Sequence, residues 1–146
     1  MKNRVVHFEI QAEDIERAKK FYAEVFGWEY QGWPMGPTTY WAIMTAPKDS
    51  AEPGLRQDGV ATASQAGING GFVQRPCPPP KPEQGTNAFT CTVQVENFDE
   101  VAKKIEGAGG KVAMPKFALP GMAWQGYFLD TEGNTFGVHQ EDKEAK

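Results

Sequence analysis

The stretch HFEIQAEDIERAKKFYAEVFGW, residues 7–28, decides the fold of this chain, because TCTVQVENFDEVAKKIEGAGGK, residues 90–111, repeats its pattern without a gap. Each stretch reads as an alternating strand, an Asp or Asn helix cap, an amphipathic helix and a glycine that ends the helix. The matched positions are physically alike: Ile10 falls on Val93, Asp14 on Asn97, Ala18 on Val101 and Tyr22 on Ile105. A repeat of this length is a supersecondary unit, so the sequence predicts two copies of one module.

Three further strands follow the helix in each copy. In the first copy, runs of aromatic and apolar residues predict strands at about 28–31, 40–45 and 68–74. In the second copy the corresponding strands are at about 111–117, 122–130 and 135–140, and Gly133-Asn134 predicts a tight turn before the last one. The predicted fold class is therefore α+β: two βαβββ modules that form a paired curved-sheet cleft, with the helices outside. Clefts between paired units are common sites for small ligands.

The repeat also sets the expected domain organisation. We expect a single domain over residues 1–146, with a first module at about 1–75 and a second at about 88–141. The proline-rich residues 76–87 join them as a stiff, extended linker. The polar, glycine-rich stretch 46–66 is long for a loop, and it is predicted to be a mobile lid or an exposed excursion.

Composition excludes several classes of protein. The net charge is -4 and the pI about 5.2, with no basic run, so a nucleic-acid surface is not expected. The first ten residues turn polar too soon for a signal peptide or a membrane span, which predicts a cytoplasmic protein with no membrane partner. Cys77 and Cys91 are the only cysteines and do not form a CxxC pair, so neither a disulfide framework nor a structural zinc site is expected.

Strand alternation selects the candidate site residues. His7 and Glu9 lie opposite the apolar face of the first strand, and Gly137 and His139 share the inward face of the last. One interpretation is a site in which Glu9 or His7 acts as a general base. The other is a polar pocket floor whose groups satisfy one another by hydrogen bonds. The predicted ligand pocket consists of His7, Glu9, Trp41, Thr90, Trp124 and His139, with the two indoles as aromatic walls.

The motif HFEI, followed by D..RA..FY...FGW and later by YFLDTEGNTFGV, resembles the vicinal oxygen chelate superfamily. That superfamily includes glyoxalase I, bleomycin-resistance proteins and extradiol dioxygenases. The resemblance covers essentially the whole chain and is closest to the glyoxalase-like branch, which is related to lactoylglutathione lyase. It implies the paired βαβββ fold, but a fold does not fix the chemistry of a site.

In metal-dependent members of that superfamily, the first and last strands of each module supply the metal ligands. Only His7 matches such a position here, because Thr90 is a poor ligand and Gly137 has no side chain. The fourth position falls within residues 69–72, where Gly70 and Gly71 also offer none. A catalytic site needs about three protein ligands. We therefore expect no metal or other cofactor, except through a shifted site formed by His7, Glu9 and His139.

Three functions follow from the resemblance. The first is metal-free binding of a small aromatic or carbonyl-containing molecule in the cleft between the modules, as in antibiotic-resistance relatives. The second is a metal-dependent lyase or isomerase of lactoylglutathione lyase type, or a dioxygenase-related enzyme, in which a strong electrophile stabilises an enediolate. The third is a non-catalytic partner module. A homodimer is expected in each case, since it is the commonest symmetric assembly.

Overall fold

The computed structural model describes residues 7–45, 67–81 and 90–146. The expected lid or excursion at 46–66 and part of the proline-rich linker lie outside the described residues. Within the described part of the chain, no helix is long and apolar enough to cross a membrane.

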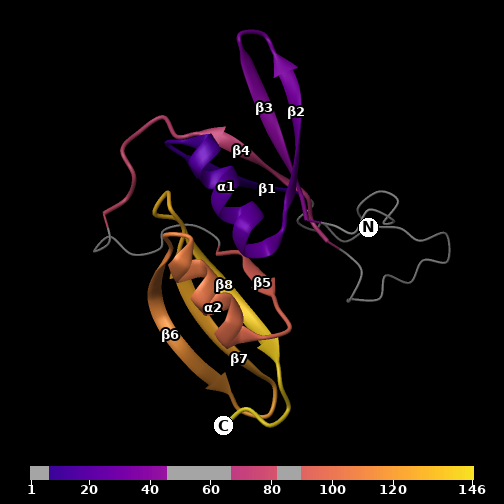
Figure 1. The fold of residues 1–146 in the computed structure, drawn as a ribbon, viewed down its shortest axis with the longest axis vertical. Coiled ribbons are helices and arrows are strands. Elements are labelled where there is room, and N and C mark those ends of the chain that lie inside the picture. The colour runs from indigo at the N-terminus through magenta and orange to yellow at the C-terminus, as the bar shows by residue number, and fades with distance from the viewer. Residues whose placement is uncertain (1–6, 46–66, 82–89) are drawn as a thin grey trace, which may run out of the picture.

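Each module forms one four-stranded sheet (Figure 1). The first sheet contains β1 (Phe8–Ala12), β2 (Glu29–Met35), β3 (Thr38–Met44) and β4 (Gly70–Gln74) in the order β1-β4-β3-β2. The second contains β5 (Thr92–Gln94), β6 (Lys111–Leu119), β7 (Ala123–Leu129) and β8 (Thr135–Glu141) in the equivalent order β5-β8-β7-β6. In both sheets the first strand pairs parallel with the last, and the other neighbours are antiparallel. The prediction of two βαβββ modules is confirmed.

The two helices begin as the repeat predicts. α1 (Ile15–Phe26) is capped by Asp14, whose Oδ1 accepts a hydrogen bond of 2.9 Å from the backbone N–H of Arg17. α2 (Phe98–Gly107) is capped by the matching residue Asn97, which accepts from the backbone N–H of Glu100 at 3.1 Å. Such caps satisfy N–H groups that the helix itself leaves unpaired.

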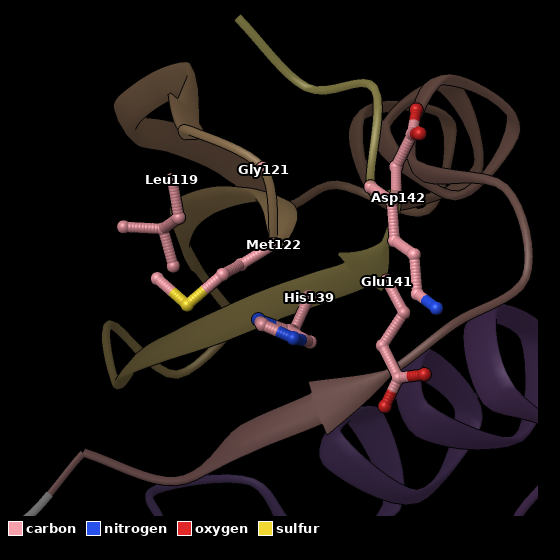
Figure 2. Close-up of a pocket in the computed structure, with 7 residues that line it drawn as sticks. Leu119, Gly121, Met122, His139, Glu141 and Asp142 are labelled. Carbon is pink, nitrogen blue, oxygen red and sulfur yellow. The ribbon is translucent and has the colours of Figure 1, made fainter.

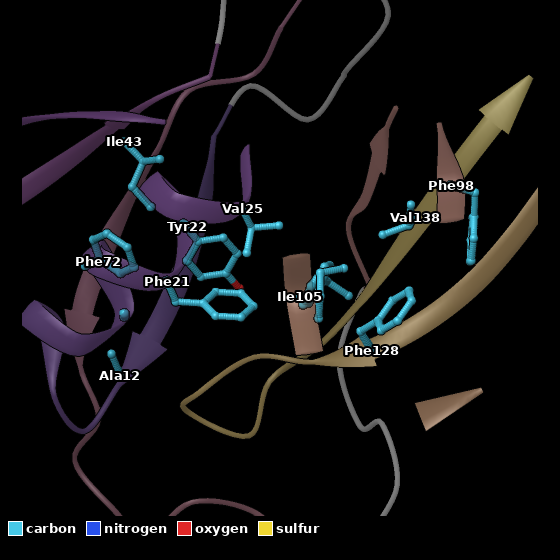
Figure 3. Packing of buried hydrophobic residues seen from close by; sticks show 12 residues of the cluster. Ala12, Phe21, Tyr22, Val25, Ile43, Phe72, Phe98, Ile105, Phe128 and Val138 are labelled. Carbon is cyan, nitrogen blue, oxygen red and sulfur yellow. The ribbon is translucent and has the colours of Figure 1, made fainter. Parts of the chain in front are cut away.

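A single apolar core joins the modules. Phe136 of β8 packs against Phe21 of α1 with ring centroids 6.1 Å apart, and it also contacts Tyr22 and Phe26. Figure 3 shows Phe21, Tyr22 and Phe72 of the first module facing a group from the second module that includes Ile105 and Phe128. Each helix therefore covers one face of its sheet and contributes to a core that both modules share.

The turn between β7 and β8, residues 130–134, also connects the modules. The Glu132 carboxylate accepts hydrogen bonds from the Arg17 side chain and from the backbone N–H of Asp14. Asp130 accepts a hydrogen bond of 2.8 Å from the hydroxyl of Tyr22, and the Asn134 amide donates to the backbone carbonyl of Gln11. These contacts hold the turn of the second module against α1 and β1 of the first, and we refer to residues 130–134 as the joint.

Candidate functional site

The face of each sheet that points away from its helix is called the open face here. On β1 the side chains of Phe8, Ile10 and Ala12 pack into the core, so His7 and Glu9 belong to the open face. On β8 the buried Phe136 and Val138 point to the core, which leaves Gly137 and His139 on the open face. The alternation predicted for these four residues therefore matches the arrangement of both strands.

In the first module, His7 is hydrogen-bonded to a tyrosine. Its Nε2 atom lies 3.0 Å from the hydroxyl of Tyr40, which projects from β3. Burial, and then the nearby charge of Glu9, raise the pKa of the Tyr40 hydroxyl, so this group remains protonated and can donate. A side chain at Gly71 of β4 would collide with the Tyr40 hydroxyl. Tyr40 thus occupies the space beside His7 that a residue on the last strand would otherwise fill.

In the second module, His139 is held by an amide. The Nδ1 atom of His139 lies 2.8 Å from Oε1 of Gln125, a buried residue on the adjacent β7. A Cβ atom at Gly137 would meet Oγ1 of Thr92 and would lie 3.0 Å from Nε2 of Gln125. Neighbouring polar side chains again take the place of a side chain on the last strand.

The strand registers show that the glycines and the side chains covering them correspond in the two modules, although His7 directly precedes β1 and His139 lies on β8. Glu9 pairs with Gly71, and its repeat partner Thr92 pairs with Gly137, so the two glycines occupy corresponding positions. Across the antiparallel pair, Ala42 lies opposite Gly71 and Tyr127 lies opposite Gly137. Two residues earlier on those strands stand Tyr40 and Gln125. One design therefore occurs twice: a glycine on the last strand, covered by a polar side chain that bonds a histidine.

This donor set does not fit the metal site of the superfamily that the sequence resembles. Gly71 and Gly137 have no side chains, and the space that such side chains would need is already filled. In the described ranges, no group of three His, Cys, Asp or Glu side chains is placed to hold a metal ion, and this includes the set His7, Glu9 and His139. A catalytic metal needs about three protein ligands, and the residues present here do not fit such a site.

A concavity of about 550 Å³ adjoins His139 (Figure 2). Figure 2 shows Leu119 and Met122 beside the His139 ring, with Glu141 further along the same strand. Met122 is 63% exposed, although it is a large apolar side chain. On the neighbouring part of the open face, Phe117 and Tyr127 stack with ring centroids 6.4 Å apart. The concavity thus combines an apolar wall with the His139 ring and with charged residues at one side, and all the residues that line it come from the second module. The charged residues are Glu141, Asp142 and Lys143.

The structure does not group all the predicted pocket residues. The indole of Trp41 packs on the helix side of its sheet, with Nζ of Lys19 3.3 Å from the ring centroid. Trp124 also packs against the core, and its indole N–H donates to Asp142 at 3.0 Å. Both indoles therefore lie on the face opposite to His7 and His139. Thr90 is half-buried and lies two residues before β5.

The sequence interpretation missed the two residues that position the histidines, Tyr40 and Gln125, and the exposed apolar residue Met122. The sequence did contain a signal that Gln125 lies beside His139. The turn at Gly133-Asn134 sets Leu129 opposite Thr135, and counting outward from there places Gln125 opposite His139. No comparable signal exists for Tyr40. A long segment separates β3 from β4, so the sequence does not show which of their residues pair.

The sequence is similar to bleomycin-resistance-like and glyoxylase-like proteins. The family described as bleomycin resistance protein-like N-terminal matches residues 4–40. A putative glyoxylase from Mycobacterium bovis is 28% identical over 92% of this chain, but the chain spans only 44% of that protein. A glyoxylase-like domain-containing protein from Didymella fabae is also 28% identical, over 89% of this chain and 88% of its own length.

Solved structures share the fold at lower identity. A fosfomycin resistance protein from Listeria monocytogenes has a TM-score of 0.66 at 14% identity, with 97% of this chain and 94% of that chain covered. An antibiotic binding protein from a Streptomyces species has a TM-score of 0.60 at 21% identity, with 97% and 98% covered. These similarities establish the arrangement of strands and helices, while the ligand has to be argued from the site itself.

Proposed function

We propose that this chain, which resembles the vicinal oxygen chelate superfamily in sequence pattern and fold, binds a small aromatic molecule on the open face of its second module, without a metal. The binding surface is the concavity beside His139, with Leu119 and Met122 as its apolar wall. Apolar pockets with a few placed polar groups are typical of small-molecule sites. A solved structure with the same fold is named as an antibiotic binding protein, and this supports binding of a small molecule here.

One observation carries the proposal: Gly71 and Gly137 supply no side chain as a metal ligand, whereas His7 and His139 are hydrogen-bonded to Tyr40 and Gln125. A lyase of glyoxalase type would need an electrophile to stabilise an enediolate, and a metal ion supplies it in the resembled enzymes. A binding protein needs only a shaped surface. The polar pairs and the apolar wall meet that requirement as they stand.

The test uses anilinonaphthalene sulfonate, an aromatic dye that fluoresces when it leaves water. In the presence of EDTA, we expect saturable binding to the native protein, and we expect Met122→Gln to weaken it several-fold because the apolar wall becomes polar. Met35→Gln is the matched control, since Met35 is 61% exposed and Met122 is 63% exposed, but Met35 lies on β2 of the first module. Equal effects of both substitutions, or loss of binding on adding EDTA, would contradict the proposal.

The remaining expectations stay predictions. A homodimer and a cytoplasmic location were inferred from the sequence, and sedimentation of the purified protein would decide the first. The resembled lyase activity would need donor groups that Gly71, Thr90 and Gly137 do not supply.

A further inference from the structure

We infer that Gln125 fixes His139 in the tautomer that carries its proton on Nδ1, so that Nε2 faces the concavity as a hydrogen-bond acceptor. The ligand class that this arrangement selects is a neutral molecule with an apolar body and an O–H or N–H donor, such as a phenol. The statement about the ligand rests on the proposed function, whereas the statement about the tautomer does not.

The argument begins with the direction of one hydrogen bond. Oε1 of Gln125 is a carbonyl oxygen and can only accept, so Nδ1 of His139, at 2.8 Å, must donate. In a neutral imidazole, one nitrogen carries the proton and the other holds a lone pair. Once Nδ1 is the donor, Nε2 is the acceptor. The hydrogen bond therefore decides which chemistry the ring can offer.

Because Gln125 is buried, losing this hydrogen bond would cost free energy. Gln125 is only 6% exposed, and its amide is packed over Gly137 beside Thr92. A buried amide that lost its partner would pay a desolvation cost, so the ring and the amide hold each other in place. Gln125 is thus a positioning residue, because it acts on a ligand only through His139.

The surroundings of the ring then define the ligand. His139 lines the concavity together with Leu119 and Met122, so a molecule that reaches Nε2 also contacts apolar side chains. A donor such as a phenolic hydroxyl can bond the Nε2 lone pair. An ether or other group that only accepts would face the lone pair without a hydrogen bond, and this mismatch leaves both groups desolvated and unpaired.

The first experiment measures the tautomer directly. Nitrogen NMR of the imidazole, at a pH where the ring is neutral, should show the proton on Nδ1 of His139 in the native protein. Gln125→Leu removes the acceptor and should shift the ring toward the Nε2–H form that unrestrained imidazoles favour in water. Gln125→Glu keeps an acceptor oxygen and should retain the Nδ1–H form, so the pair separates loss of the hydrogen bond from a general packing defect. A native spectrum with the proton on Nε2 would overturn the inference.

The second experiment tests the ligand class with a matched pair of probes, naphthol and its methyl ether methoxynaphthalene. The native protein should bind naphthol about threefold to tenfold more tightly, which corresponds to one hydrogen bond. Gln125→Leu should shrink that ratio toward one. Equal affinities in the native protein would overturn the ligand class. If neither probe binds, the proposed function fails for aromatic ligands, while the nitrogen spectrum still decides the tautomer.

Discussion

Gly71 and Gly137 leave space on the open faces that neighbouring polar side chains occupy. Each stands on the last strand of its module, where the resembled metalloenzymes carry ligands, and each lies beneath a polar side chain from the adjacent strand. A glycine in a strand permits such a close approach at a cost in local stability. At Gly71 this close approach admits the Tyr40 side chain.

The first prediction concerns Gly71→Ala. The new methyl group would overlap the Tyr40 side chain, and we expect a loss of about 1 to 3 kcal/mol in the free energy of unfolding, as for other overpacked sites. Urea denaturation measures this loss. In a Tyr40→Ala background the same substitution should cost much less, because the ring that it strikes is gone.

Gly107→Ala is the control for the loss of glycine itself. Gly107 ends α2, and a Cβ atom there would meet nothing within 4 Å. This substitution should stabilise the protein by up to about 1 kcal/mol, because it restricts the unfolded chain. If Gly71→Ala behaves like Gly107→Ala, Tyr40 does not fill the position as described.

At the scale of elements, the joint at residues 130–134 contains two carboxyl groups whose pKa values are shifted. Burial tends to raise the pKa of Glu132, but hydrogen bonds from Arg17 and from the backbone of Asp14, together with the charge of Arg17, hold it below its usual value. The pKa of Asp130 is raised by burial, although several hydrogen bonds act in the opposite direction. The two carboxylates of one turn therefore respond to pH with opposite signs.

Glu132→Gln tests this element. A carboxylate with a lowered pKa stabilises the folded state above its ordinary pKa, and the stabilisation is lost as the pH falls through the folded value. The variant should be less stable than the native protein by about 2 kcal/mol near pH 7, an estimate for charge-assisted hydrogen bonds to a partly exposed arginine. The difference should shrink below about pH 4. Asp130 is present in both proteins, so its contribution cancels in the difference.

The measurement is a series of urea titrations from neutral to acidic pH. Glu16→Gln serves as the control, because Glu16 pairs with Lys19 on the surface of α1 and should change stability little at any pH. A destabilisation of Glu132→Gln that stays constant down to acidic pH would mean that the ionised carboxylate is not what the joint requires.

At the same scale, the sequence predicted the elements well and the site only in part. Caps at Asp14 and Asn97 and the turn at Gly133-Asn134 are local features, so single residues reveal them. The side on which Trp41 lies depends on the pairing of β3 with β4, which are separated by a long segment. The periodicity of one strand cannot show that pairing, so the sequence alone could not place Trp41 relative to His7.

For the whole molecule, the shared core implies that the modules unfold together. Phe136 contacts three aromatic rings of α1, and the joint adds polar contacts between the modules. Phe136→Ala should lower the free energy of unfolding by about 3 to 5 kcal/mol, because it opens a cavity where the two modules meet.

Tryptophan fluorescence can test whether both modules lose stability together in Phe136→Ala. Trp28, Trp33 and Trp41 belong to the first module and only Trp124 to the second, so Trp124→Phe makes the fluorescence report on the first module. Hydrogen exchange of α2 reports on the second. Phe136→Ala should shift both transitions equally, whereas separate transitions would show that the modules are independent.

The central proposal is that the protein binds no catalytic metal, because the pairs His7–Tyr40 and His139–Gln125 lie where the resembled metalloenzymes hold one. Equilibrium dialysis of the purified protein against zinc and nickel, followed by measurement of bound metal per chain, tests it most directly. The account predicts binding no tighter than about micromolar, near -8 kcal/mol, because no three suitable ligands converge in the described part of the chain. About one metal ion per chain remaining after dialysis into metal-free buffer would contradict it.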